Sequence, residues 1–187
     1  MIAYIKGKVV HRGGNYLIVE TGGVGYKVFA GTDLVSKSGQ VELFIYHTVR
    51  EDASDLYGFE SANDLDIFEL LLTVSGVGPK AALNILSNLG RDKIISAITR
   101  GDTGLFKSVS GIGNKVAAKI IVELKSKIAG GDYSGAILPE EDETVEALQA
   151  LGYKPQEILP YLKEIPANLT RTQDKVRYIL KNVGKRV

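Results

Sequence analysis

Two stretches of the chain place glycines and a lysine at the same spacing. Residues 73–82 read TVSGVGPKAA and residues 108–117 read SVSGIGNKVA, so both follow the pattern apolar-Ser-Gly-apolar-Gly-x-Lys. Gly76 and Gly111 are 35 residues apart, and such a close internal repeat indicates two copies of one supersecondary unit. Each copy is expected to be a helix, a tight glycine turn and a second helix.

The two lysines occupy positions that favour an anionic ligand. Lys80 and Lys115 fall in the first turn of the second helix of each unit, and Pro79 suits a first helical position. The helix dipole disfavours a cation there, whereas the N–H groups of the first turn favour an anion. A bound phosphate would resolve this conflict, and glycine would let the backbone approach it closely. The alternative, a purely structural turn with solvated lysines, explains one copy better than two.

Positive charge is concentrated around these two stretches. The net charge of the chain is only +1, but residues 76–127 carry nine basic and three acidic side chains. Lys119 follows Lys115 by one helical turn, on the same predicted stripe. Such a local excess over two candidate phosphate sites is expected of a protein that binds a nucleic-acid backbone.

The paired pattern resembles the helix-hairpin-helix motif, which holds DNA by its backbone without reading sequence. Contacts to phosphate position a protein on a duplex, whereas contacts to base edges specify a sequence. The resemblance implies that two tandem motifs grip successive phosphates of a duplex arm. The predicted DNA-binding residues are Gly76, Val77, Gly78, Lys80, Gly111, Ile112, Gly113, Asn114, Lys115 and Lys119.

Two adjacent carboxylates, Glu51 and Asp52, are expected near the tip of a projecting hairpin over residues 47–59. They would repel phosphates, so their use would be to keep a DNA backbone out of a central space. A solvated polar turn is one alternative. A two-metal nuclease site that includes Asp55 is another, although neighbouring residues of an extended hairpin point to opposite faces, which is poor geometry for binding one ion.

Residues 2–60 are typical of a small β-barrel. Five or six short strand-like runs alternate with glycine-rich turns, and an OB-fold is the commonest barrel of this size. The runs lie at residues 2–5, 9–10, 16–19, 26–29 and 41–46, with turns at 13–15, 22–23 and 31–33. A barrel of this kind also suits single-strand binding on aromatic side chains, but the aromatic residues here are spaced as core residues.

Residues 64–128 are predicted to be helices that carry both glycine turns. Ser61 offers an N-cap for the first helix, with Asp64 and Asp66 in its first turn. Gly90 offers a C-terminal stop, and a short connecting helix is expected over residues 92–99. The last helix carries an apolar stripe at Val116, Ile120, Leu124 and Ile128.

An acidic, glycine-rich segment precedes the last part of the chain. Residues 129–143 are predicted to be a flexible linker, because glycine, serine and a block of like charge bury little apolar surface. Residues 144–187 are predicted to form three short helices at 144–151, 155–163 and 172–183, and this part resembles the ubiquitin-associated (UBA) type of three-helix fold. Its size suits an interaction module. The candidates for a partner surface are Leu148, Leu151 and Tyr153, for which plain core is the alternative.

Composition and the absence of certain motifs exclude several classes of protein and of site. With 44% hydrophobic and 24% charged residues, the 187-residue chain is typical of globular protein, and it has no cysteine for disulfides, thiolate metal sites or nucleophiles. No apolar run approaches the ~20 residues of a membrane helix, and no signal-peptide pattern is present, so a cytoplasmic location without membrane contact is predicted. No Gly-x-x-x-x-Gly-Lys-Ser/Thr loop or catalytic constellation is visible. We therefore expect no catalytic residue, cofactor or metal, and any ATPase must be another chain.

These motifs, taken in order, resemble the bacterial RuvA family over the whole chain except the linker. They are VREDA at 49–53, LYGF at 56–59, the two glycine turns, and ALGYKP at 150–155. The resemblance implies an α+β multidomain protein with an OB-fold barrel over residues 1–62, a tandem helix-hairpin-helix domain over 63–128, the linker over 129–143 and a three-helix domain over 144–187. Asn114 departs from the family, which often has a second basic residue there, but its amide can still donate to phosphate.

The resemblance also implies a function. The chain would be the Holliday-junction-binding subunit of a branch-migration motor in recombination and DNA repair, and would hold a four-way junction open and square-planar. Glu51 and Asp52 would form an acidic pin at the junction centre, and the last domain would dock on the RuvB ATPase. A homotetramer with fourfold symmetry, or an octamer on DNA, is implied, with the RuvC junction resolvase as a further partner.

Overall fold

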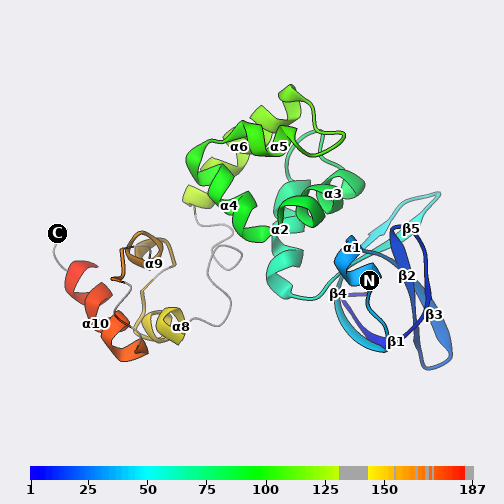
Figure 1. The fold of residues 1–187 in the computed structure, drawn as a ribbon, viewed down its shortest axis with the longest axis horizontal. Helices are drawn as coiled ribbons and strands as arrows, with labels where there is room; N and C mark the ends of the chain where they lie inside the picture. The colour runs from blue at the N-terminus through cyan, green and yellow to red at the C-terminus, as the bar shows by residue number, and fades with distance from the viewer. Residues whose placement is uncertain (131–142, 154, 163, 167–168, 170, 184–187) are drawn as a thin grey trace. The chain divides into compact units, whose positions relative to one another are not determined.

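The structure, a computed structural model, describes residues 1–130, 143–153, 155–162, 164–166, 169 and 171–183 (Figure 1). It divides into two compact units, Met1–Lys125 and Ser126–Val187, which are described separately. Most of the predicted linker, residues 131–142, lies outside the described residues. The predicted fold class is confirmed: a five-stranded barrel is followed by a helical middle part and a small helical C-terminal part.

The first unit begins with a closed barrel in the strand order β1-β2-β3-β5-β4. Successive side chains of each strand point alternately into and out of the barrel, and Leu17, Val19 and Leu43 point inward, where they are fully buried. All pairs are antiparallel except β3 with β5, which closes the barrel in parallel. The strands are β1 (Tyr4–Arg12), β2 (Tyr16–Thr21), β3 (Val24–Phe29), β4 (Gln40–Val49) and β5 (Ser54–Phe59).

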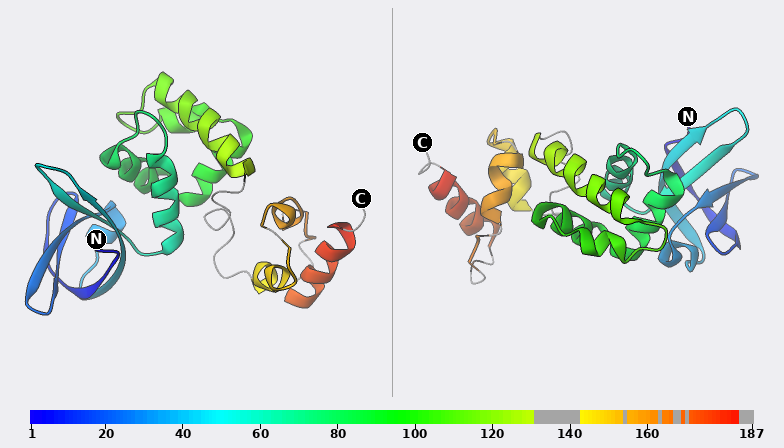
Figure 2. Two further views of the ribbon diagram at one scale, coloured as in Figure 1. Left: turned by 180° about the vertical axis from the view of Figure 1, so that it is seen from behind. Right: turned by 90° about the horizontal axis from the view of Figure 1, so that it is seen from above.

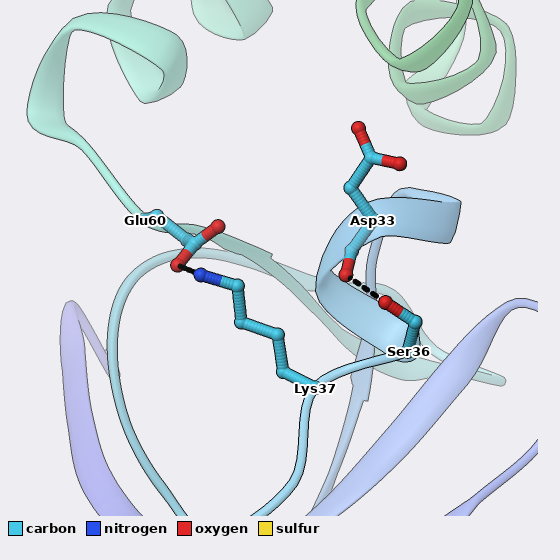
Figure 3. Close-up of polar contacts among 4 residues, drawn as sticks. All are labelled: Asp33, Ser36, Lys37 and Glu60. Atoms are coloured by element: carbon cyan, nitrogen blue, oxygen red, sulfur yellow. Dashed lines mark hydrogen bonds and ion pairs between the residues drawn. The ribbon is translucent and has the colours of Figure 1, made fainter.

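Two predicted features of the barrel differ in the structure. The runs expected at 2–5 and 9–10 are one strand, β1, because its backbone pairs with β4 through the intervening Lys6-Gly7-Lys8 and with β2 from Lys8 onward. The turn expected at 31–33 is instead the start of a short helix, α1 (Thr32–Val35). Just after α1, Lys37 pairs with Glu60, which directly follows β5, and the Ser36 hydroxyl donates to the carbonyl of Asp33 (Figure 3).

The helical middle part follows directly from β5. Ser61 caps α2 by accepting a hydrogen bond from the Asp64 amide, as predicted, and Phe68 of α2 packs on the barrel with its ring centroid 4.8 Å from that of Phe59. Asp66 lies beyond the first turn in which it was expected. The helices are α2 (Ala62–Leu72), α3 (Pro79–Leu89), α4 (Arg91–Arg100), α5 (Thr103–Lys107) and α6 (Asn114–Gly130).

After α6, the described residues of the second unit form three short helices, α8 (Glu143–Ala150), α9 (Pro155–Leu162) and α10 (Thr172–Val183). The Thr172 hydroxyl donates to the Glu143 carboxylate at 2.8 Å and so joins the starts of α8 and α10. Across the residues described, no helix combines the length and apolar character needed to cross a bilayer. The buried core of this unit is Val145, Leu148, Ile158, Tyr161 and Ile179.

Candidate nucleic-acid interface

The two glycine turns have the same backbone geometry. Gly76 and Gly111 adopt φ values of 94° and 86°, a region that side-chain-bearing residues rarely enter. Two residues before each of these glycines is a valine whose carbonyl accepts from the amide three residues on, at 3.0 Å in the first turn and 3.1 Å in the second. The sequence repeat is thus a structural repeat, α2–turn–α3 and α5–turn–α6.

The apolar residue of each turn anchors it from inside. Val77 and Ile112 are 5% and 8% exposed, so their side chains pack into the core. Of the predicted DNA-binding residues, these two can therefore offer a ligand only their backbone groups.

The second glycine of each turn borders open space. A Cβ built on Gly78 or on Gly113 meets no atom within 4 Å apart from its chain neighbours, and both glycines are exposed in the part of the chain that the structure describes. Gly78 is the N-cap of α3 and provides no side-chain cap, and the first helical hydrogen bond runs from the Ala82 amide to the Gly78 carbonyl at 2.9 Å. The equivalent bond in the second motif joins Ala117 to Gly113 at 3.0 Å. The amides before these bonds are the groups that an anion at a helix N-terminus would use.

Three exposed lysines surround these helix starts. Lys80 lies in the first turn of α3, and Lys115 and Lys119 lie one turn apart on α6. Within the part of the chain that the structure describes, none of the three pairs with a carboxylate. Asn114, the first residue of α6, is exposed beside them. The arrangement can hold phosphate groups by backbone amides and by point charges.

The two hairpins are joined by a residue that the sequence analysis missed. The side-chain amide of Asn84 on α3 donates to the carbonyl of Ser110 in the second turn, at 2.8 Å. The available signal was the repeat itself, because Asn84 aligns with Lys119 and is one of the positions where the two copies differ in charge.

The acidic pair lies at the tip of the β4–β5 hairpin. The last strand pair is Val49 with Ser54, and the Arg50 amide donates to the Ala53 carbonyl at 2.7 Å to close a four-residue tip in which Glu51 and Asp52 are exposed. The hairpin extends beyond the rest of the barrel in every view (Figures 1 and 2, cyan). Its end therefore presents two carboxylates away from the barrel.

The predicted partner-surface residues have different environments. Leu148 is fully buried in the core of the three-helix unit, and Tyr153 is half-buried against that core. Leu151 is 59% exposed. Leu148 thus has the core role that was its alternative, and a surface in this region would be made by Leu151 and the exposed part of Tyr153.

Family models match three parts of the chain. Residues 1–58 match the RuvA N terminal domain, residues 68–126 match a SAM-like helix-hairpin-helix tandem, and residues 139–183 match the RuvA C-terminal domain. The second match contains both glycine turns and all three lysines described above.

Curated relatives match nearly the full chain. A protein from Clostridium beijerinckii is 42% identical over 199 aligned positions, which cover 99% of this chain and 98% of the relative. One from Halothermothrix orenii is 46% identical over 164 positions, with 84% of each chain covered. One from Ruminiclostridium cellulolyticum is 36% identical over 199 positions, with 98% and 100% covered. All three are named Holliday junction branch migration complex subunit RuvA. With this identity over this coverage, the chain belongs to the RuvA family.

Proposed function

We propose that this chain binds four-way (Holliday) junction DNA without reading its sequence, holds the junction open and square-planar, and recruits the RuvB ATPase for branch migration. The observation that carries the proposal is the repeated hairpin geometry, with an uncovered helix start and an exposed lysine in each copy. The names of the relatives supply the substrate, because they are subunits of a Holliday junction branch migration complex.

The proposed mechanism is electrostatic. The starts of α3 and α6, with Lys80, Lys115 and Lys119, hold duplex arms by their phosphates. Because no base edge is contacted, the same grip forms at every register and the DNA can slide through it. Glu51 and Asp52 repel backbones at the crossover and keep the strands apart while they exchange partners.

The chain acts in this proposal as a DNA-binding subunit and not as an enzyme. Energy for branch migration comes from ATP hydrolysis by RuvB, which the three-helix unit recruits through a surface that includes Leu151 and Tyr153. Assembly as a homotetramer, or as an octamer on DNA, contact with the RuvC resolvase and a cytoplasmic location are further parts of the proposal. Mass measurement with and without a synthetic four-way junction tests the assembly.

Two other candidate functions would need different arrangements of side chains. A junction nuclease would use Glu51, Asp52 and Asp55, but no three such side chains gather into a metal-binding group among the described residues. Asp55 pairs with Thr48 in the strands below the tip, whereas the other two lie in the tip itself. A single-strand binder would use the barrel, whose aromatic rings pack largely on one another and on Phe68.

The test is a competition experiment with a labelled four-way junction. We expect duplex and single strands to compete weakly and Mg²⁺ to cause no cleavage. Lys80→Ala and Lys115→Ala should each weaken binding to junction and duplex alike and lower the salt dependence by about one phosphate contact per lysine. Unchanged affinity and salt slope in both variants would rule out the phosphate grip, and metal-dependent cleavage would favour the nuclease.

A further inference from the structure

One hydrogen bond joins the two DNA-binding motifs directly. The Nδ2 atom of Asn84, on the second helix of the first motif, lies 2.8 Å from the carbonyl oxygen of Ser110, 26 residues later. Ser110 immediately precedes Gly111, the residue whose positive φ makes the second turn. The bond therefore ends on the backbone of the turn that sets the direction of α6.

The orientation of the Asn84 amide is fixed from its other side. Asn88, one helical turn later, donates its Nδ2 group both to the Asn84 side-chain oxygen and to the Asn84 backbone carbonyl, each at 2.8 Å. A backbone carbonyl can only accept, so Asn84 must present its NH₂ group to Ser110 and its oxygen to Asn88. Both contacts agree on one orientation of the Asn84 amide, and the three residues form a chain of hydrogen bonds with a single direction.

A second contact shows that the motifs face each other. A Cβ built on Gly76 in the first turn would lie 3.9 Å from a γ-methyl carbon of Val116 on α6. Each turn thus lies against the second helix of the other motif. This contact is apolar and does not by itself fix the angle or spacing of the two helix starts, whereas a hydrogen bond has a preferred direction.

The position of Asn84 carries a different kind of side chain in the second copy of the repeat. Asn84 aligns with Lys119, so the first copy has an amide directed at the other motif where the second copy has an exposed cation. Asn84 lies one helical turn after Lys80, as Lys119 lies one turn after Lys115, but its side chain is an uncharged amide directed at Ser110.

We infer that Asn84 is a positioning residue that sets the spacing between the two helix starts, so that both can hold phosphates of one duplex arm at the same time. The inference rests on the proposed function. Two linked sites gain affinity only when their geometry permits simultaneous contact. Without the bond to Ser110, the second turn must be ordered when DNA binds, and that ordering lowers affinity.

The experiment is a double-mutant cycle between Asn84→Ala and a silenced second motif, Lys115→Ala with Lys119→Ala, measured by junction affinity. We expect Asn84→Ala to weaken binding about threefold to tenfold when the second motif is intact, as for loss of one hydrogen bond. When the second motif is silenced, Asn84→Ala should have no further effect. Asn88→Ala should show the same dependence with a smaller loss, because Asn84 then loses its orientation.

Thr99→Ala is the matched control. It removes a hydrogen bond of 2.9 Å to a backbone carbonyl, that of Ile95, within α4 alone. It should leave junction affinity unchanged in both backgrounds, and melting temperatures of all variants report the folded state.

The outcomes separate the inference from the function on which it rests. If the lysine variants weaken binding but Asn84→Ala costs the same in both backgrounds, Asn84 contacts DNA itself or supports the fold generally, and the positioning role is wrong. An unchanged affinity in Asn84→Ala also overturns it. If the lysine variants have no effect at all, the proposed function fails first.

Discussion

The glycines of the two hairpins have two separate roles that can be tested one residue at a time. Gly76 and Gly111 need positive φ to make the turn, whereas Gly78 and Gly113 have no positive φ and border open space. The first pair serves the fold. In the proposed function, the second pair serves the close approach of a ligand.

We expect Gly113→Ala to weaken junction binding while changing the free energy of unfolding by less than about 1 kcal/mol. The added methyl group meets no protein atom but stands where a phosphate would approach the backbone. Gly111→Ala is the contrasting variant: its positive φ should cost about 1–2 kcal/mol of stability, although its Cβ would also meet nothing. Melting curves and junction titrations measure the two effects. Full binding by a folded Gly113→Ala protein would favour the purely structural turn.

The partly buried carboxyl of Asp66 on α2 leads to a prediction about how the stability of the fold depends on pH. Burial raises the pKa of Asp66, and burial followed by the charge of Asp66 raises the pKa of Glu69. The folded state then binds more protons than the unfolded chain between the ordinary and the raised pKa values, so stability falls as pH rises through this window. Asp66→Asn should therefore stabilise at neutral pH, by less than about 1 kcal/mol because the side chain is only partly buried.

The gain from Asp66→Asn should disappear at pH below the ordinary aspartate pKa of about 4, where the carboxyl is protonated in both states. Thermal melts across this range provide the measurement. Asp52→Asn is the control, since this exposed carboxyl lies at the hairpin tip. A loss of stability in Asp66→Asn at neutral pH would mean that the carboxylate makes a favourable contact that outweighs its burial.

At the scale of elements, variants of the β4–β5 hairpin tip distinguish two interpretations of its carboxylates: a pair that repels phosphate, or a solvated turn without a DNA-related role. If Glu51 and Asp52 repel phosphates, changing both to Asn removes an unfavourable interaction of order 1 kcal/mol per close pair. The variant should bind junction and duplex more tightly, prefer junctions less, and differ from the parent less at high salt. Competition titrations at two salt concentrations measure this.

A matched charge change provides the control for the hairpin. Glu157→Gln with Glu164→Gln raises the net charge by the same amount on exposed positions of the three-helix unit. It should leave junction preference unchanged. Equal preference in the Glu51 and Asp52 double variant and in the parent, at low salt, would leave a solvated turn as the explanation of the acidic pair.

Elements defined by local chemistry were predictable from the sequence. The two hairpins, the Ser61 cap and the Pro79 start of α3 depend on residues within one turn of each other, and the structure has them where the sequence predicts them. The extent of β1 was not predictable, because its pairing with β4 continues across the gap between the runs expected at 2–5 and 9–10.

Features that depend on residues far apart in the sequence also could not be predicted from local sequence patterns. The bond between Asn84 and Ser110 spans 26 residues, and no spacing rule within α3 indicates it. Leu148 was equally suited to core or surface, because the sequence pattern of so small a domain does not distinguish its core from a partner surface. Only the packing of α8, α9 and α10 assigns it to the interior.

At the scale of the whole molecule, the division into two units predicts separable functions. A chain ending after Ala129 keeps the unit Met1–Lys125 and both glycine turns. It should fold with an unchanged melting temperature and bind junctions within about twofold of the parent, since no DNA-binding residue of the proposal is lost. It should fail to stimulate ATP hydrolysis by RuvB on junction DNA. Loss of junction binding on truncation would place part of the DNA interface in the three-helix unit.

The parallel pairing that closes the barrel also has a consequence for how the chain folds. It joins only Val28 with Leu56 and Phe29 with Tyr57, residues 28 positions apart, whereas the β1–β2 and β2–β3 pairs are neighbouring hairpins. Contacts between distant residues form late, because the intervening loop must first be closed. The β1–β4 pairing spans 32–40 positions but has five residue pairs, so the β3–β5 seam, with two pairs, should be the first part of the barrel to open. Amide hydrogen exchange along β3 would report that opening before the rest of the barrel unfolds.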